Sequence, residues 1–219
     1  MKTIRIIALL CVSAVSAWAQ QQTRERDTYS AYSPYNEYVT FNASLHYGIG
    51  LPFGTQADYL NKTTTANAVV QFDWMFPARF SLGLKSGYQY DQRRLPRQVF
   101  QFGDESVSAV QTRTLTVIPV LATASYYFAD NTAALRPYVQ LGGGGAFVDN
   151  STFYGTLVDR QSGFRGAIAP AIGVKFYGKR DGNIGGEIQA QYQYIAHKDP
   201  TFSKLQGLLI SAGLTFRWF

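Results

Sequence analysis

Apolar and polar residues alternate with a period of two along most of the chain after residue 36. In the stretch 39–51, for example, the odd positions are apolar and the even positions are polar or glycine. A period of two puts these two sets on opposite faces of a β-strand. The same alternation predicts seven further strands at 68–76, 80–90, about 112–128, 137–148, 164–176, 184–194 and 208–218.

Two of the predicted strands depart from simple alternation. The strand at about 112–128 has apolar residues on both faces, and Pro119 within it predicts a bulge or an irregular ladder. The strand at 137–148 contains the run Gly142–Gly145. Four consecutive glycines in a strand indicate sharp curvature or backbones that approach closely.

The predicted connections alternate between short and long. Three short turns are expected around Pro77, Asn131 and Asp181, and four longer polar loops at about 52–65, 91–110, 149–162 and 196–205. Strands of this length with short turns at one end and long loops at the other are typical of a transmembrane barrel. The sequence therefore predicts an all-β fold, an eight-stranded antiparallel up-and-down transmembrane β-barrel over residues 37–219, with its long loops outside the cell.

Charged residues occur within the polar set of these strands. They are Asp73, Lys85, Arg165, Lys175, Glu187 and Arg217. The apolar set holds too many aromatic residues for a narrow interior, so we expect it to face lipid while the polar set lines the lumen. Closure is required because no water satisfies an open strand edge inside a membrane. Side chains fill the interior of an eight-stranded barrel, so we predict that these six residues form a connected lumen network that plugs it.

The first residues have the three parts of a secretory signal peptide. Lys2 and Arg5 precede an apolar run over 6–15, and small residues flank Trp18. This pattern predicts a signal peptide over 1–19, with cleavage between Ala19 and Gln20. The single cysteine lies inside that segment, so the mature chain has no disulfide. Residues 20–36 are polar and are predicted to be a flexible periplasmic leader.

Charge and composition narrow the possible partners. The formal net charge is +6, but the basic residues are scattered singly, and export argues against a nucleic-acid partner. Outer-membrane lipid and lipopolysaccharide are the more natural partners. Arg93, Arg94 and Arg97 in the second long loop could bind lipopolysaccharide phosphates through paired hydrogen bonds. An ordinary solvated loop is the alternative interpretation.

Two segments carry a resemblance to a known family. The stretches 118–128 and 136–142 resemble the central hairpin of the small outer-membrane barrels that include OmpA-, OmpX- and OmpW-like proteins. At the C-terminus, Ser211, Gly213, Phe216 and Trp218 resemble the assembly signal read by the barrel-insertion machinery, although Phe219 follows the pattern. The resemblance implies a monomer in the bacterial outer membrane that meets this machinery during assembly, and it implies no cofactor.

Catalytic chemistry has one candidate. Ser44 and His46 share the polar face of the first strand, and Glu187 could supply the acid of a nucleophilic set for acyl transfer. These side chains would face the lumen, away from any acyl chain, so a hydrogen-bonded lumen network is the favoured interpretation. Cysteine or histidine clusters that could bind a metal are not present in the mature sequence. We therefore expect a non-enzymatic outer-membrane barrel with a structural or surface-interaction role, with a narrow solute channel or a lipid A-modifying enzyme as alternatives.

Overall fold

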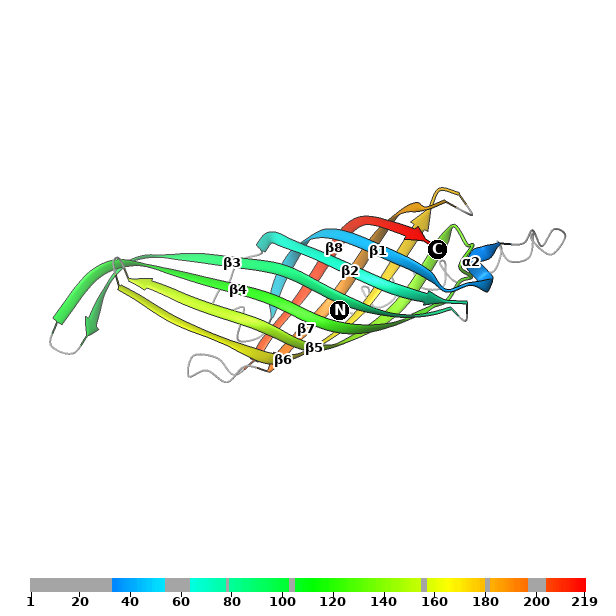
Figure 1. Cartoon of the computed structure of the whole chain (residues 1–219). Coiled ribbons are helices and arrows are strands. Elements are labelled where there is room, and N and C mark those ends of the chain that lie inside the picture. The colour runs from blue at the N-terminus through cyan, green and yellow to red at the C-terminus, as the bar shows by residue number, and fades with distance from the viewer. Residues whose placement is uncertain are drawn as a thin grey trace, which may run out of the picture.

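The computed structural model describes residues 33–53, 64–77, 79–102, 105–154, 157–179, 182–196 and 204–219. These residues form eight strands that close into a barrel, preceded by one helical turn, α2 (Pro34–Glu37) (Figure 1). The strands are β1 (Thr40–Phe53), β2 (Thr64–Phe76), β3 (Phe80–Phe102), β4 (Glu105–Tyr127), β5 (Leu135–Tyr154), β6 (Leu157–Tyr177), β7 (Ile184–Ala196) and β8 (Lys204–Trp218). The predicted signal peptide and its cleavage site, Ala19 and Gln20, lie outside the described residues. Among the described residues, no helix is long and apolar enough to cross a membrane.

Each strand pairs antiparallel with the next, and β1 pairs with β8 to close the ring. The closing seam runs from Phe41 opposite Trp218 to Phe53 opposite Gln206. The predicted eight-stranded antiparallel up-and-down barrel is therefore confirmed. The start of β1, the end of β8 and the three short connections lie at one end of the barrel (Figure 1), which is the periplasmic end in barrels of this design.

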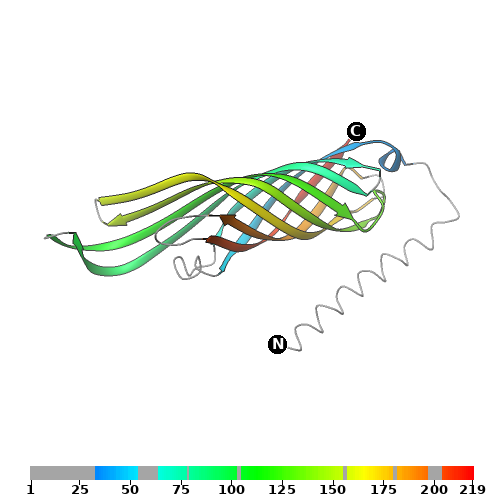
Figure 2. The same cartoon turned by 90° about the horizontal axis from the view of Figure 1, so that it is seen from below.

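Four strands extend beyond the other four at the opposite end of the barrel (Figures 1 and 2). The pairing of β2 with β3 reaches only Tyr90, whereas β3 and β4 pair onward to Phe102 opposite Glu105. We call residues 91–102 of β3, 105–114 of β4, 149–154 of β5 and 157–166 of β6 the outer extension. The prediction of loops at 91–110 and 149–162 was thus wrong for most of their length. These stretches are polar, but their threonine, valine and phenylalanine residues suit paired strands.

The register contains bulges that the sequence did not indicate. Pro119 was expected to cause one, but the pairs on both sides of it, with β3 and with β5, keep one register. The β3–β4 register shifts instead between Arg94 and Arg97, around Pro96, and the β1–β2 register shifts between Gly48 and Gly50. A proline removes one hydrogen-bond donor from a ladder. The missing hydrogen bond does not require an extra residue in the strand, so the register around Pro119 is kept.

The two faces of the strands differ as the alternation predicts. Large apolar side chains on the outer surface are exposed around the whole ring, for example Leu45, Leu84, Leu141, Ile172 and Leu214. Polar side chains on the inner surface are buried. A continuous apolar outer surface around a closed sheet is the arrangement of a barrel that faces lipid.

The outer half of the lumen contains an apolar cluster. Its members come from β4 to β8 and are Leu115, Val117, Leu121, Ala146, Val148, Ala167, Ala169, Ile195 and Leu205. This cluster explains why β4 is apolar on both faces. The outward face of β4 meets lipid, and the inward face of β4 packs in the cluster. The interior therefore has a polar layer toward the periplasm and an apolar layer above it.

Leu84→Arg tests the assignment of the outer face. Leu84 is exposed near the middle of 80–90, the part of β3 that pairs with β2 in the closed ring, at a lipid-facing position. An arginine there is expected to lower the free energy of unfolding in lipid vesicles by about 2–4 kcal/mol, the cost of this side chain near the membrane midplane. Gln92→Arg, exposed on the same face but in the outer extension, is the control and is expected to be close to neutral. Equal losses in the two variants would contradict the assignment.

Candidate functional site

The periplasmic end of the lumen is closed by Tyr35 of α2. Its side chain is buried, its ring centroid lies 4.5 Å from that of Phe219, and the Arg217 guanidinium lies 3.8 Å from its ring centroid. The Tyr35 hydroxyl donates to Asn183 Oδ1 at 2.8 Å. The predicted flexible leader therefore ends earlier than residue 36, because this aromatic side chain gains more from burial than from solvation.

A layer of cations and tyrosine rings lies directly above this cap. The Arg136 guanidinium is 4.5 Å from the ring centroid of Tyr127, and that of Arg217 is 4.2 Å from the centroid of Tyr177. Arg217 also donates to the backbone carbonyls of Gly182 and Asn131, each at 2.7 Å. Cation–π contacts of this kind are stronger when they are desolvated. Arg136 was not predicted as a lumen residue, because it stands at the start of a strand beside Pro137 rather than within a clear alternation.

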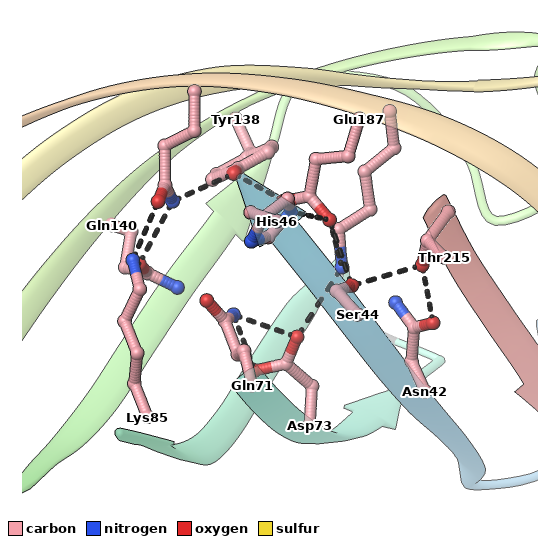
Figure 3. A network of polar contacts seen from close by, with 12 residues as sticks. Asn42, Ser44, His46, Gln71, Asp73, Lys85, Tyr138, Gln140, Glu187 and Thr215 are labelled. Atoms are coloured by element: carbon pink, nitrogen blue, oxygen red, sulfur yellow. Dashed lines mark hydrogen bonds and ion pairs between the residues drawn. The ribbon is translucent and has the colours of Figure 1, made fainter. Parts of the chain in front are cut away.

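An ion cluster occupies the next level of the lumen (Figure 3). Lys175 Nζ lies 3.2 Å from Asp73 Oδ2 and 3.6 Å from Glu187 Oε2, and all three side chains are fully buried. Gln71 Nε2 donates to both carboxylate oxygens of Asp73, at 2.9 and 2.8 Å. One lysine thus holds together two carboxylates from strands on different sides of the barrel.

Glu187 is the hub of this cluster and also brings Ser44 and His46 together (Figure 3). Ser44 Oγ donates to Glu187 Oε2 at 2.8 Å, and His46 Nε2 lies 3.1 Å from the same oxygen. In a nucleophilic set the imidazole stands between the hydroxyl and the acid. Here the carboxylate stands between the other two groups, so the imidazole is not placed to take the proton of Ser44. The arrangement suits a structural network better than acyl transfer.

Lys85 is held by amide oxygens instead of carboxylates. Its Nζ donates to the side-chain oxygens of Gln140, Gln189 and Gln191, at 3.0, 2.5 and 2.5 Å. Gln189 in turn donates to the Tyr138 hydroxyl at 2.8 Å, and Tyr138 donates to Glu187. Lys85 is therefore connected to the ion cluster through two side chains.

Glycines make room for the large lumen side chains. Gly213 pairs directly with His46, Gly83 with Asp73 and Gly173 with Tyr138. At each of these glycines an added Cβ would overlap the facing side chain or the neighbouring backbone. Within the four-glycine run, a Cβ at Gly144 would overlap the carbonyl of Val120, which confirms the expected close approach of backbones. Gly213, singled out as part of an assembly signal, therefore also has a packing role.

A hollow lies at the outer mouth of the closed barrel, where β1, β2, β7 and β8 end. Its volume is about 30 Å³, which is room for about two water molecules. Its polar residues are Asn67, Gln89, Asp91 and Gln193, and apolar side chains of β4, β7 and β8 form another part of its wall. Gln89 Nε2 donates to Gln193 Oε1 at 2.8 Å, while Gln193 Nε2, which is buried, has no hydrogen-bond partner among the described residues.

Known proteins are similar to this chain in structure but not in sequence. No protein-family model matches the sequence, and no curated protein matches it either. Neisserial surface protein A has a similar structure: the TM-score is 0.50 at 13% sequence identity, over 82% of this chain and 97% of that one. The chain has the fold of the small outer-membrane β-barrels. Its closed ring, lipid-facing surface and polar lumen agree with a place in the bacterial outer membrane.

Two further solved structures align with this chain at lower TM-scores. Ail, the attachment invasion locus protein of Yersinia pestis, aligns with a TM-score of 0.47 at 13% identity, over 82% of this chain and 97% of that one. The outer membrane protease OmpT of Escherichia coli aligns with a TM-score of 0.46 at 7% identity, over 86% and 99%. A fold does not by itself select a function.

The structure separates the six charged residues predicted to form one network in this outer-membrane barrel. Asp73, Lys85, Lys175 and Glu187 are joined directly or through the side chains already described. Arg217 belongs to the tyrosine layer below them. Arg165 does not join the network: it lies on the inner side of β6 within the outer extension and is only half-buried. The separation follows from strand tilt, because residues on one face of a strand occupy different heights in the barrel.

The three arginines predicted in the second loop lie in β3 instead. Arg93 is on the inner face, directly opposite Arg113, while Arg94 and Arg97 are exposed on either side of the bulge. In the part of the chain that the structure describes, no group of three or more His, Cys, Asp or Glu side chains could hold a metal ion.

The outer face of the extension carries an ion pair between β5 and β6. Arg160 Nε donates to the two carboxylate oxygens of Asp149, at 3.2 and 3.0 Å. The hydrogen bonds from this guanidinium lower the pKa of the Asp149 carboxyl. The pair is largely exposed at Arg160, so it links the two strands without contributing much to stability.

Proposed function

We propose that this protein is a non-enzymatic, closed outer-membrane barrel that acts at the cell surface by presenting the outer extension to other molecules. Two observations carry the proposal: buried, interconnected side chains cross the lumen, and four strands project beyond the membrane-facing ring. A channel needs an open lumen, and a barrel with a purely structural role does not need projecting strands.

The contents of the lumen support the closed state. From the periplasm outward, the path is crossed by the Tyr35 cap, the cation–tyrosine layer, the ion cluster, the amides around Lys85 and the apolar cluster. Arg136 and Lys175 are fully buried in spite of their charge. Buried charges are tolerated when they are paired and hydrogen-bonded, and such pairs also fill space.

The chemistry of the outer extension supports a binding role. Its inner face continues upward from the barrel mouth with polar side chains, among them Arg93, Arg113 and Asn150. Arg94 and Arg97 project from its outer face, where we propose that they contact phosphates of neighbouring lipopolysaccharide. Binding residues concentrate on exposed segments held by a rigid scaffold. We propose further that the barrel is a monomer, and that its C-terminal strand with Phe216 and Trp218 is read by the barrel-insertion machinery.

Planar-bilayer recording tests whether the lumen is closed. The refolded protein is expected to give no reproducible conductance steps, because buried side chains fill the lumen around the charged groups. Lys85→Met, which removes one cation but keeps most of its volume, is expected to remain silent. Regular open steps in the wild-type protein that change size or ion selectivity in Lys85→Met would favour the channel alternative over our proposal.

A further inference from the structure

We propose that the helical turn α2 is a clasp that holds the closed ring shut, and that Phe219 is the residue that receives it. α2 and the C-terminus lie at the same end of the barrel (Figures 1 and 2). Phe219 follows the last residue of β8, Trp218, and has no ladder partner among the described residues of the neighbouring strands. Its ring lies instead against the buried ring of Tyr35, with 4.5 Å between the centroids. The turn that precedes β1 therefore packs on the residue that follows β8, at the periplasmic end of the seam.

Strand parity separates Phe219 from the aromatic residues of the predicted assembly signal. Phe216 and Trp218 are exposed on the lipid side, and the Trp218 ring stacks on an aromatic ring of β1 across the seam. Arg217 and Phe219 have the opposite parity, and both contact the ring of Tyr35. Phe219 therefore belongs with the groups that close the lumen, and not with the aromatic side chains that face lipid.

Tyr35 also binds two turns that come together only in the closed barrel. Its hydroxyl donates to Asn183 Oδ1 at 2.8 Å, in the connection between β6 and β7. Its backbone carbonyl accepts from Asn131 Nδ2 at 3.0 Å, in the connection between β4 and β5. These two partners are 148 and 96 positions away in the sequence. No local folding event brings them together, so the contacts of Tyr35 form only when the turns are in their final places.

Contacts that form after the ring has closed act on its opening. Removing an interaction that is absent from the folding transition state raises the unfolding rate and leaves the folding rate nearly unchanged. The clasp links the segment before β1 with the end of β8 and with two turns, so it must detach before the seam can separate at this end. It therefore gives the barrel kinetic stability, a resistance to unfolding that is measured as a rate. The closed lumen of the proposed function does not depend on the clasp, because the ion cluster and the apolar cluster cross the path above it.

Unfolding and refolding rates of the refolded protein in detergent micelles test the clasp. Tyr35→Ala removes the capping ring, Phe219→Ala removes the receiving ring, and a double variant removes both. Tyr38→Ala makes the same change at a nearby exposed tyrosine and is the matched control. Unfolding is started by transfer into urea and refolding by dilution out of urea, and both are followed by heat-modifiable gel mobility.

Tyr35→Ala and Phe219→Ala are each expected to unfold at least about tenfold faster than the wild type, which is the effect of losing a buried aromatic contact. Their refolding rates are expected to stay within about twofold of the wild-type rate, because the clasp docks after the transition state. The double variant is expected to unfold little faster than Tyr35→Ala, since the two rings form one contact. Tyr38→Ala is expected to stay within about twofold of the wild type in both rates. If an alanine variant does not refold, Tyr35→Phe and Phe219→Leu carry the test, with unfolding about threefold faster from the lost bond to Asn183 or the lost ring contact.

A measurement in cells separates the clasp from the assembly signal. Phe219→Ala is expected to reach the outer membrane in the same folded amount as the wild type, because the insertion machinery acts before the clasp docks. Wild-type unfolding rates in Tyr35→Ala, or rate increases that multiply in the double variant, would overturn the proposal. So would a Phe219→Ala protein that assembles poorly in cells but unfolds at the wild-type rate in micelles, since Phe219 would then belong to the signal. Conductance steps in bilayers would remove the proposed function and leave the clasp standing, whereas unchanged unfolding rates in silent barrels would remove the clasp alone.

Discussion

Lys175→Met is expected to lower the free energy of unfolding by about 3–5 kcal/mol, because it removes the only cation within ion-pair distance of Asp73 among the described residues and takes the lysine away from Glu187. Both carboxylates are inaccessible to solvent, and neither can move to water without opening the barrel. Methionine retains most of the volume of the lysine side chain, so the loss of stability reports the missing charge and not a new cavity. Urea unfolding in detergent, followed by heat-modifiable gel mobility, measures it.

A variant with all three charges removed, Lys175→Met with Asp73→Asn and Glu187→Gln, separates pairing from burial. Neutral groups of similar shape carry little desolvation penalty, so this variant is expected to recover most of the stability lost in Lys175→Met. Arg160→Ala breaks the exposed ion pair with Asp149 and should stay close to wild type. If the triple variant were as unstable as Lys175→Met, the cluster would not be held by charge pairing.

The second large effect is expected at the seam that closes the ring. Gly213 of β8 lies between β1 and β7, and a Cβ added there would stand 2.5 Å from His46 Cδ2 and would overlap the carbonyl oxygen of Leu45. The Leu45 carbonyl belongs to the strand backbone and cannot turn away. Gly213→Ala is expected to lower stability by about 1–3 kcal/mol and to reduce the fraction that refolds, because over-packing displaces side chains and backbone.

Gly143→Ala is the matched control for this substitution. Gly143 also lies within a strand, but a Cβ there would meet nothing within 4 Å. Alanine restricts the unfolded chain more than glycine does, so Gly143→Ala is expected to be neutral or stabilising by about 0.5–1 kcal/mol. Refolding yields and unfolding midpoints of the two variants are compared under identical conditions. Equal destabilisation would mean that strand glycines are needed for flexibility and not for space at the seam.

Much of the fold was accessible from the sequence because strand alternation is a local property. The period of two separated the lipid face from the lumen face correctly at Asp73, Lys85, Lys175 and Glu187, which are all buried inside the ring. Strand number and strand order followed from the same pattern, since each strand pairs with its chain neighbour. The lengths of the outer strands did not follow, because polar residues such as Gln92 and Arg97 were predicted as loop although they are paired in the extension.

Only the tertiary structure decided which lumen residues meet. Ser44 contacts Glu187 across 143 positions of sequence, and Lys85 contacts Gln191 across 106. Such contacts depend on strand tilt and register, which no short window of sequence contains. The same cause put Arg165 above the network and placed Arg136 in the cation–tyrosine layer below it.

The alternating pattern by itself thus determined a closed, lipid-facing barrel with a charged interior, because the side-chain direction of a strand depends only on residue parity. Which carboxylates hold Lys175, and where the Gln193 amide nitrogen is left without a partner among the described residues, were decided by the closing of β1 on β8. Closure sets the height of every lumen side chain relative to the others, and hydrogen bonds and ion pairs form only between groups at the same height.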